Sequence, residues 1–311
     1  MRKLILMAAM VGAATVTFGF AAGGAGAHRH RSMNITTSDR GPVKDCDQVE
    51  INYDHRDAIR DEQDFTLTKA QVERLEVRPS HNGGMSIVGM DRQDYSIKAC
   101  KAVDSSASDS RGLLNKIAVS MTNGRISVDG PGDDEDWVVY LIVQVPRNSA
   151  PLDLEATNGE ISLHDISGQI TARTENGPID LTHCTGEIRA KAQNGPIDFT
   201  GSAGDLRLDA QNGPITVTLT GEKWEGVGLD AHSENGPLTL HVPDRYVSGI
   251  HVEATGYSPF SCEAPACNEA KGTWHRENHS VDLGSGTTLV RLATVNGPVE
   301  IESARARDFL F

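Results

Sequence analysis

Asparagine–glycine pairs recur in this chain at a constant interval, and this repeat is the strongest constraint on its fold. The pairs that begin at Asn158, Asn176, Asn194 and Asn212 follow one another every 18 residues. A second glycine lies nine residues after the glycine of each of the first three pairs, at Gly168, Gly186 and Gly204. A unit this short cannot bury an apolar surface by itself, so successive units must stack on one another.

Within each unit, apolar and polar residues alternate after both glycines. Ile179 and Leu181 flank Asp180, and Ile188 and Ala190 flank Arg189. This period of two predicts half-buried β-strands, because a helix would need apolar residues three or four positions apart. We therefore expect an all-β fold: a parallel β-solenoid of about 18-residue coils, with two short strands per coil and neighbouring coils ~4.8 Å apart.

The asparagine–glycine pairs are expected at the corners of the coils. Glycine reaches positive φ without steric cost and asparagine tolerates that region, so we expect positive φ there. Stacked asparagine side chains would form a column that is joined by amide hydrogen bonds. The predicted turn ladder comprises Asn158, Gly159, Asn176, Gly177, Asn194, Gly195, Asn212, Gly213, Asn235, Gly236, Asn296 and Gly297.

The repeat register also assigns interior and outward positions. Cys184 takes the position of Ile166, one unit earlier, which favours a small buried hydrophobic residue over a reactive thiol. The outward positions form polar rows that we interpret as solvated faces. One row comprises Ser162, Asp180, Asp198 and Thr216, and another comprises Thr171, Arg189 and Arg207.

Outside the repeats the signals are weaker. Residues 138–145 form a continuous apolar strand, and residues near 105–117 predict one short helix at an edge of the solenoid. The expected organisation is a signal peptide over 1–27, a polar, irregular leader over 28–65, the solenoid over 66–303 and a tail over 304–311. Within the solenoid we expect regular coils over 152–240 and an insertion over 255–280. Insertions in solenoids often bind ligands, but solenoid ends also need a cover, and the sequence leaves both interpretations open for 255–280.

The beginning of the chain predicts export. Arg2 and Lys3 precede an apolar run, and residues 25–27 (Ala-Gly-Ala) fit the small-residue cleavage pattern of a signal peptide. No later segment predicts a transmembrane anchor in the mature chain, so we expect a periplasmic protein or one at the cell surface. The net charge of −14 disfavours nucleic acid as a partner.

Five cysteines in an exported chain predict disulfides. Cys262 and Cys267 enclose a short loop that a local bridge could close, which leaves Cys46 and Cys100 as the second pair.

Two histidine-containing segments are candidate metal sites. If residues 275–279 form one strand, His275, Glu277 and His279 lie on the same side of it. His28 and His30 at the expected mature N-terminus could bind copper or nickel with backbone nitrogens. A solvated polar edge explains both segments more simply, and the corners lack the aspartates of calcium-binding β-rolls, so no cofactor is expected.

The units that begin with NGPI, the segment VPRNSAPLDLEATNGEISL and the closing LATVNGPVEIES resemble the bacterial putative-adhesin family of domain of unknown function 4097, over roughly residues 70–303. The resemblance implies a non-enzymatic cell-envelope β-solenoid, and its pattern supplies no catalytic residues. We expect such a protein to bind another envelope protein or a surface glycan. The alternatives are a β-solenoid enzyme that acts on polysaccharide, with residues 275–279 near its site, and a purely structural scaffold.

Overall fold

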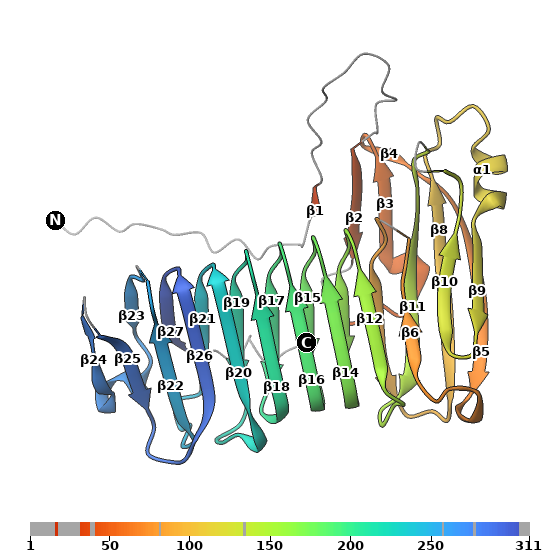
Figure 1. The fold of residues 1–311 in the computed structure, drawn as a ribbon. Coiled ribbons are helices and arrows are strands. Elements are labelled where there is room, and N and C mark those ends of the chain that lie inside the picture. Colours follow the sequence, from red (N-terminus) through yellow and green to blue (C-terminus); the bar gives the residue numbers. More distant parts are fainter. Residues whose placement is uncertain are drawn as a thin grey trace.

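The computed structural model describes residues 16–17, 32–37, 41–80, 82–132, 135–256, 258–275 and 278–304. Two large sheets stack face to face along an elongated solenoid (Figure 1), and we call them sheet I and sheet II. Sheet I has twelve strands in the spatial order β24 (Lys271–His275), β25 (Asn278–Leu283), β22 (Gly249–Ala254), β26 (Thr288–Asn296), β20 (Glu225–Asn235), β18 (Ala203–Ala210), β16 (Thr185–Ala192), β14 (Ser167–Thr174), β12 (Leu152–Ala156), β6 (Leu75–Val77), β10 (Arg125–Asp129) and β9 (Ala118–Thr122).

Sheet II supplies the second layer. Its eleven strands are, in spatial order, β23 (Phe260–Cys262), β27 (Val299–Ser303), β21 (Leu238–Val242), β19 (Ile215–Leu219), β17 (Ile197–Gly201), β15 (Ile179–Thr182), β13 (Ile161–His164), β7 (Met85–Met90), β11 (Trp137–Pro146), β8 (Asp94–Val103) and β5 (Ile59–Thr68). The short helices are α1 (Ser110–Lys116), η1 (Cys46–Gln48), η2 (Lys69–Gln71) and η3 (Pro265–Glu269).

The strand register follows the repeat. Ile170 of β14 lies opposite Ile188 of β16, and Ile188 lies opposite Leu206 of β18, so equivalent positions stack from coil to coil. Their side chains are buried between the two sheets, as are those of Ile179 and Ile197 on sheet II. The predicted all-β parallel solenoid with two strands per coil is confirmed, and α1 is the predicted short helix.

The two glycine columns have different physical causes, and one expectation was wrong. The glycines of the repeated Asn-Gly pairs do not adopt positive φ; a Cβ on Gly195 would instead lie 2.0 Å from the carbonyl oxygen of Gly177 on the neighbouring coil. Close approach of two backbones therefore requires glycine there. Positive φ occurs in the second column, where Gly186 has φ 103° and Gly204 has φ 124°.

At both ends the coils stack out of chain order. The last coil, β26–β27, lies between the β20–β21 coil and the β22–β23 coil. At the other end, β6 and β7 lie between β10–β11 and β12–β13. At the C-terminal end the chain skips one coil position and fills it last, with β26 and β27, whereas at the other end it passes from β11 to β12 across a position that β6 and β7 already occupy.

The described residues of the leader that we predicted as polar and irregular over 28–65 form regular structure. β2 (Met33–Thr37), β3 (Val49–Tyr53) and β4 (Arg56–Asp57) make a small four-stranded sheet with β1 (Val16–Thr17), and β5 begins at Ile59. Val49 and Ile51 of β3 bury their side chains against the outer side of sheet II, beside Val138 and Ile142 of β11. The run of residues 138–143 in β11 is continuously apolar because both faces of the strand are covered there.

Candidate binding surfaces

An unbroken asparagine ladder follows the edge where each coil passes from sheet I to sheet II. The side-chain amide of Asn176 donates to Asn158 Oδ1 at 2.8 Å, and the amide of Asn194 donates to Asn176 Oδ1 at 3.0 Å. The same bond links the remaining members in turn: Asn82, Asn158, Asn176, Asn194, Asn212, Asn235 and Asn296. Because each inner member donates and accepts within the ladder, we assign it a structural role.

Cys184 lies in the interior between the sheets and forms no disulfide. Burial raises the pKa of its thiol to about 12, so the thiol stays protonated at neutral pH. A protonated, enclosed thiol is a poor nucleophile, which fits a packing role.

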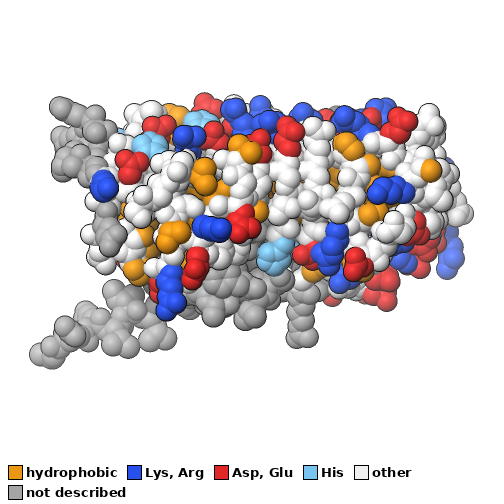
Figure 2. All heavy atoms as spheres, turned by 90° about the horizontal axis from the view of Figure 1, so that it is seen from below, with side chains coloured by type: hydrophobic (Ala, Val, Ile, Leu, Met, Phe, Trp, Pro, Cys, Tyr) orange, Lys and Arg blue, Asp and Glu red, His pale blue; other side chains and the backbone are white. Residues whose placement is uncertain are grey.

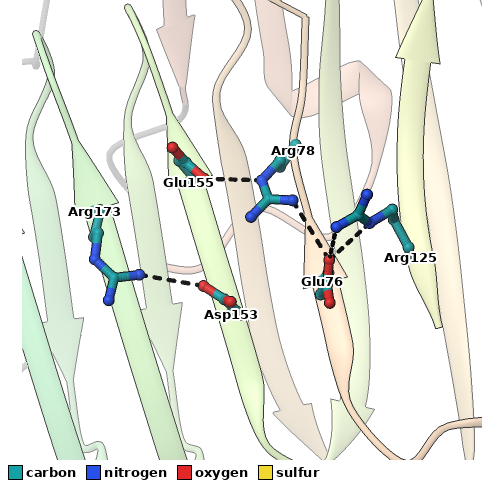
Figure 3. A network of polar contacts seen from close by, with 6 residues as sticks. All are labelled: Glu76, Arg78, Arg125, Asp153, Glu155 and Arg173. Carbon is teal, nitrogen blue, oxygen red and sulfur yellow. Dashed lines mark hydrogen bonds and ion pairs between the residues drawn. The ribbon is translucent and has the colours of Figure 1, made fainter.

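The outer face of sheet I carries charged side chains along its length. At its N-terminal end they form a network across four strands, β10, β6, β12 and β14 (Figure 3). Glu76 pairs with Arg125 at 2.6 Å and with Arg78 at 3.4 Å, and Arg78 pairs with Glu155 at 2.8 Å. The hydrogen bond and charge of Arg125 lower the pKa of Glu76. These ion pairs link the β6 coil, which stacks out of chain order, to the neighbouring coils.

The charges are arranged differently in the middle of sheet I. Arg189 of β16 lies directly opposite Arg207 of β18, and Arg173 of β14 lies directly opposite Lys191 of β16. All four side chains are exposed. We call these four residues the cation patch. Figure 2 shows basic and acidic side chains along the upper border of the molecule, which is the sheet I side in that view.

The outer face of sheet II carries hydroxyl and carboxyl groups. Asp180 of β15 and Asp198 of β17 lie opposite each other, and Thr182 Oγ1 donates to Asp180 Oδ1 at 2.9 Å. Burial raises the pKa of both carboxyl groups to about 6, and the charge of Asp180 adds to the rise at Asp198. Glu160, directly before β13 of the neighbouring coil, is hydrogen-bonded to Tyr140 of β11, and burial also raises the pKa of Glu160.

Both disulfides predicted from cysteine spacing are present. Cys46 is bonded to Cys100 and ties the small sheet to β8 of sheet II. A pocket of about 330 Å³ beside this bond is lined in part by Arg60 and Lys101. Both charged groups bind protein atoms: Lys101 pairs with Asp61 at 3.2 Å, and Arg60 donates to the carbonyl oxygen of Val49 at 3.0 Å.

Residues of the expected insertion lie at the C-terminal end of the stack. Cys262 at the end of β23 is bonded to Cys267 within η3, and the β24–β25 hairpin forms the last two strands of sheet I. The ring of Trp274 stacks on that of Phe260 at 4.5 Å and its Nε1 donates to the carbonyl oxygen of Ser258 at 2.9 Å. Of the two interpretations left open, the position and the packed aromatic rings favour a cover for the solenoid end.

The predicted histidine sites rest in part on His28, His30 and Glu277, which lie outside the described residues. His275 is the last residue of β24 and pairs with Asn278 at the start of β25, so His275 and His279 lie on two antiparallel strands rather than on the one strand that we expected. Within the described ranges, no group of three or more metal-ligating side chains could hold a metal ion.

No described helix is long and apolar enough to cross a membrane.

Comparisons with known proteins identify the family. No curated protein matches the chain. Several solved structures are similar to it, including the following three. A putative cell adhesion protein from Clostridium sporogenes is 13% identical, with 79% of this chain and 100% of that chain covered and a TM-score of 0.33.

A putative adhesin from Bacteroides fragilis is 9% identical over 78% of this chain and 97% of its own, with a TM-score of 0.34. A putative lipid binding protein from Parabacteroides distasonis is 8% identical over 78% of this chain and 96% of its own, with a TM-score of 0.32. The family described as Toastrack DUF4097 matches residues 58–251, which is more than half of the chain. The chain therefore belongs to the Toastrack DUF4097 family.

Proposed function

We propose that this protein is an exported, non-enzymatic, adhesin-like component of the cell envelope, and that it binds another envelope protein or a surface glycan through the outer face of sheet I. One observation carries the proposal. No element within the described ranges covers that face, which lies open along the solenoid (Figure 1), whereas the small sheet covers part of sheet II.

Export is supported by two independent features. The chain starts with a positive, apolar and small-residue pattern typical of a signal peptide. Cys46–Cys100 and Cys262–Cys267 are disulfides, which persist in oxidising compartments outside the cytoplasm.

Binding rather than catalysis is supported by the shape and chemistry of sheet I. Its outward carboxylates are largely held in ion pairs on an open surface, such as Glu76 with Arg125 and Glu187 with Arg189. Catalytic sites usually enclose their substrate in a concave pocket. An open, rigid surface of paired charges suits contact over a wide area.

Site-specific photo-crosslinking in cells tests the proposal. A crosslinking amino acid replaces Thr171, which faces outward on β14 of sheet I, and in a matched variant replaces Thr216, which faces outward on β19 of sheet II. We expect a discrete crosslinked partner from position 171 and none from position 216. No crosslink from either position, or crosslinks from position 216 alone, would overturn the proposal. The mass of the exported chain, expected to begin at residue 28, checks export.

A further inference from the structure

The cation patch places like charges next to each other, which a β-sheet does not need for its own stability. Arg189 and Arg207 are direct cross-strand neighbours, and so are Arg173 and Lys191. Like charges directly opposite each other destabilise a sheet. At the N-terminal end of the same face, Arg125 lies opposite Glu76 instead. The patch therefore carries an electrostatic cost that a bound anion would relieve.

The ion pairs around the patch leave donors free for a ligand. Arg189 uses Nη2 toward Glu187 Oε1 at 3.1 Å, and Arg207 uses Nε toward Asp209 Oδ2 at 3.0 Å. Arg173 uses only Nη1, toward Asp153 at 3.4 Å. A guanidinium group has five N–H donors, so most remain available. Among the described residues, Lys191 has no ion pair.

The spacing of the patch fits a linear polymer with one anionic group per unit. Adjacent strands lie ~4.8 Å apart, and alternate residues on one strand lie ~7 Å apart. One pyranose unit of an extended polysaccharide has nearly the length of the strand spacing. A chain that crosses β14, β16 and β18 would therefore bring successive carboxylates to successive coils, where arginine can bind each carboxylate with two parallel hydrogen bonds.

The acidic residues around the patch narrow the ligand class. Glu187 and Asp205 are direct neighbours in the adjacent outward row, and Asp209 lies opposite Lys191. These carboxylates would repel a densely charged polyphosphate, and the whole chain has a net charge of −14. Sugar hydroxyl groups, in contrast, can donate hydrogen bonds to them. The surroundings favour a polymer that alternates carboxylates with hydroxyls.

We propose that Arg173, Arg189, Lys191 and Arg207 bind an anionic polysaccharide of the uronic acid type, which lies across the coils of sheet I. This inference rests on the proposed function, because it names the ligand class of the same face. It differs from that proposal in what must be measured, since binding to a defined polysaccharide needs no cellular partner.

Calorimetric titration of the exported full chain with polygalacturonate tests the inference, with dextran as the uncharged polysaccharide. The variant R189Q/R207Q removes two charges from the patch. The matched control R125Q/R291Q removes two charges from the same face, where Arg291 lies between Asp230 and His251 rather than beside another cation. We expect affinity about tenfold weaker or more for R189Q/R207Q and little change for the control. Raising NaCl from about 50 to 200 mM should weaken binding of the unmodified protein.

Thermal unfolding tests whether weaker binding results from a loss of folded protein. Because R189Q/R207Q relieves a repulsion, it should melt at the same temperature as the unmodified protein or higher. Absence of polygalacturonate binding, equal binding of dextran or equal losses in both variants would overturn the inference. If polygalacturonate fails while position 171 still crosslinks to a partner in cells, the ligand class is wrong and the binding face is right. Failure of both experiments removes the proposed function as well.

Discussion

The two outer faces of the solenoid are built from the same repeats and handle charge in opposite ways. On sheet I, carboxylates meet cations at the surface, and Arg125 lowers the pKa of Glu76. On sheet II, Asp180 and Asp198 face each other without a described cation between them, and burial raises the pKa of each to about 6. Sheet I therefore lowers the pKa of a carboxyl group, whereas sheet II raises the pKa values of two.

This difference shows what the repeat does and does not control. The unit dictates which residues point inward, because both faces need the same apolar interior. Outward positions are not under that constraint, so the polar and charged residues can differ between the two outer faces. Part of sheet II is a packing surface for the small sheet, whereas no described element covers the outer face of sheet I.

The largest effect is expected in the interior that both faces share. Cys184→Asp places a carboxylate among apolar side chains without a cation partner and should lower the free energy of unfolding by about 3–5 kcal/mol. Urea unfolding measures this loss, with Cys184→Ala as the control that removes the thiol without adding charge. A change below about 1 kcal/mol would show that position 184 does not face the interior.

A smaller effect is expected at the edge that joins the two faces. Gly195→Ala brings a Cβ against the carbonyl oxygen of Gly177, a backbone atom that cannot move away cheaply. We expect a loss of about 2 kcal/mol in the free energy of unfolding. The control is Gly132→Ala, where the new Cβ has no atom within 4 Å. Equal melting temperatures for the two variants would contradict the close-approach explanation.

The sequence predicted what the repeat controls and missed what lies outside it. The stacked positions, the asparagine ladder and the buried Cys184 follow from identical spacing in successive units. The out-of-order coils at both ends were not predicted, because a repeat says that coils stack but not which coil fills a vacant position. The small sheet was missed although Val49 and Ile51 of β3 alternate with polar residues as in a half-buried strand, because the surface on which they pack lies on distant β11.

Acid titration should separate the two faces by the sign of the effect. The pKa of Asp180 is raised from 3.8 to about 6, so the folded state binds more protons than the unfolded state between these values. Stability therefore falls as pH rises through this window. Asp180→Asn should stabilise the protein by about 1 kcal/mol at pH 8, after allowance for partial exposure, and by nothing below about pH 4.

Glu76→Gln on sheet I should behave in the opposite way. Because Arg125 lowers the pKa of Glu76 below 4.5, its contribution is present above that value and is lost as the pH falls through the folded-state pKa. The variant should be less stable than the unmodified protein at neutral pH, and the difference should shrink in acid. Chemical unfolding of both variants from pH 4 to 8 checks the pair, and parallel pH profiles would refute the contrast between the faces.

The smallest effect separates the two parts of sheet I. Asp209→Asn removes a carboxylate that pairs with Arg207 at 3.0 Å and lies opposite Lys191, and an exposed pair of this kind contributes only about 0.5 kcal/mol. Arg189→Gln loses a comparable ion pair, with Glu187, but also removes the repulsion with Arg207, so it should be neutral or slightly stabilising. Urea unfolding at low salt and in about 1 M NaCl resolves the two, because screening should bring both variants to the unmodified value. If Arg189→Gln destabilises as much as Asp209→Asn at low salt, Arg207 does not repel Arg189, and the cation patch is an ordinary ion-pair lattice like the network around Glu76.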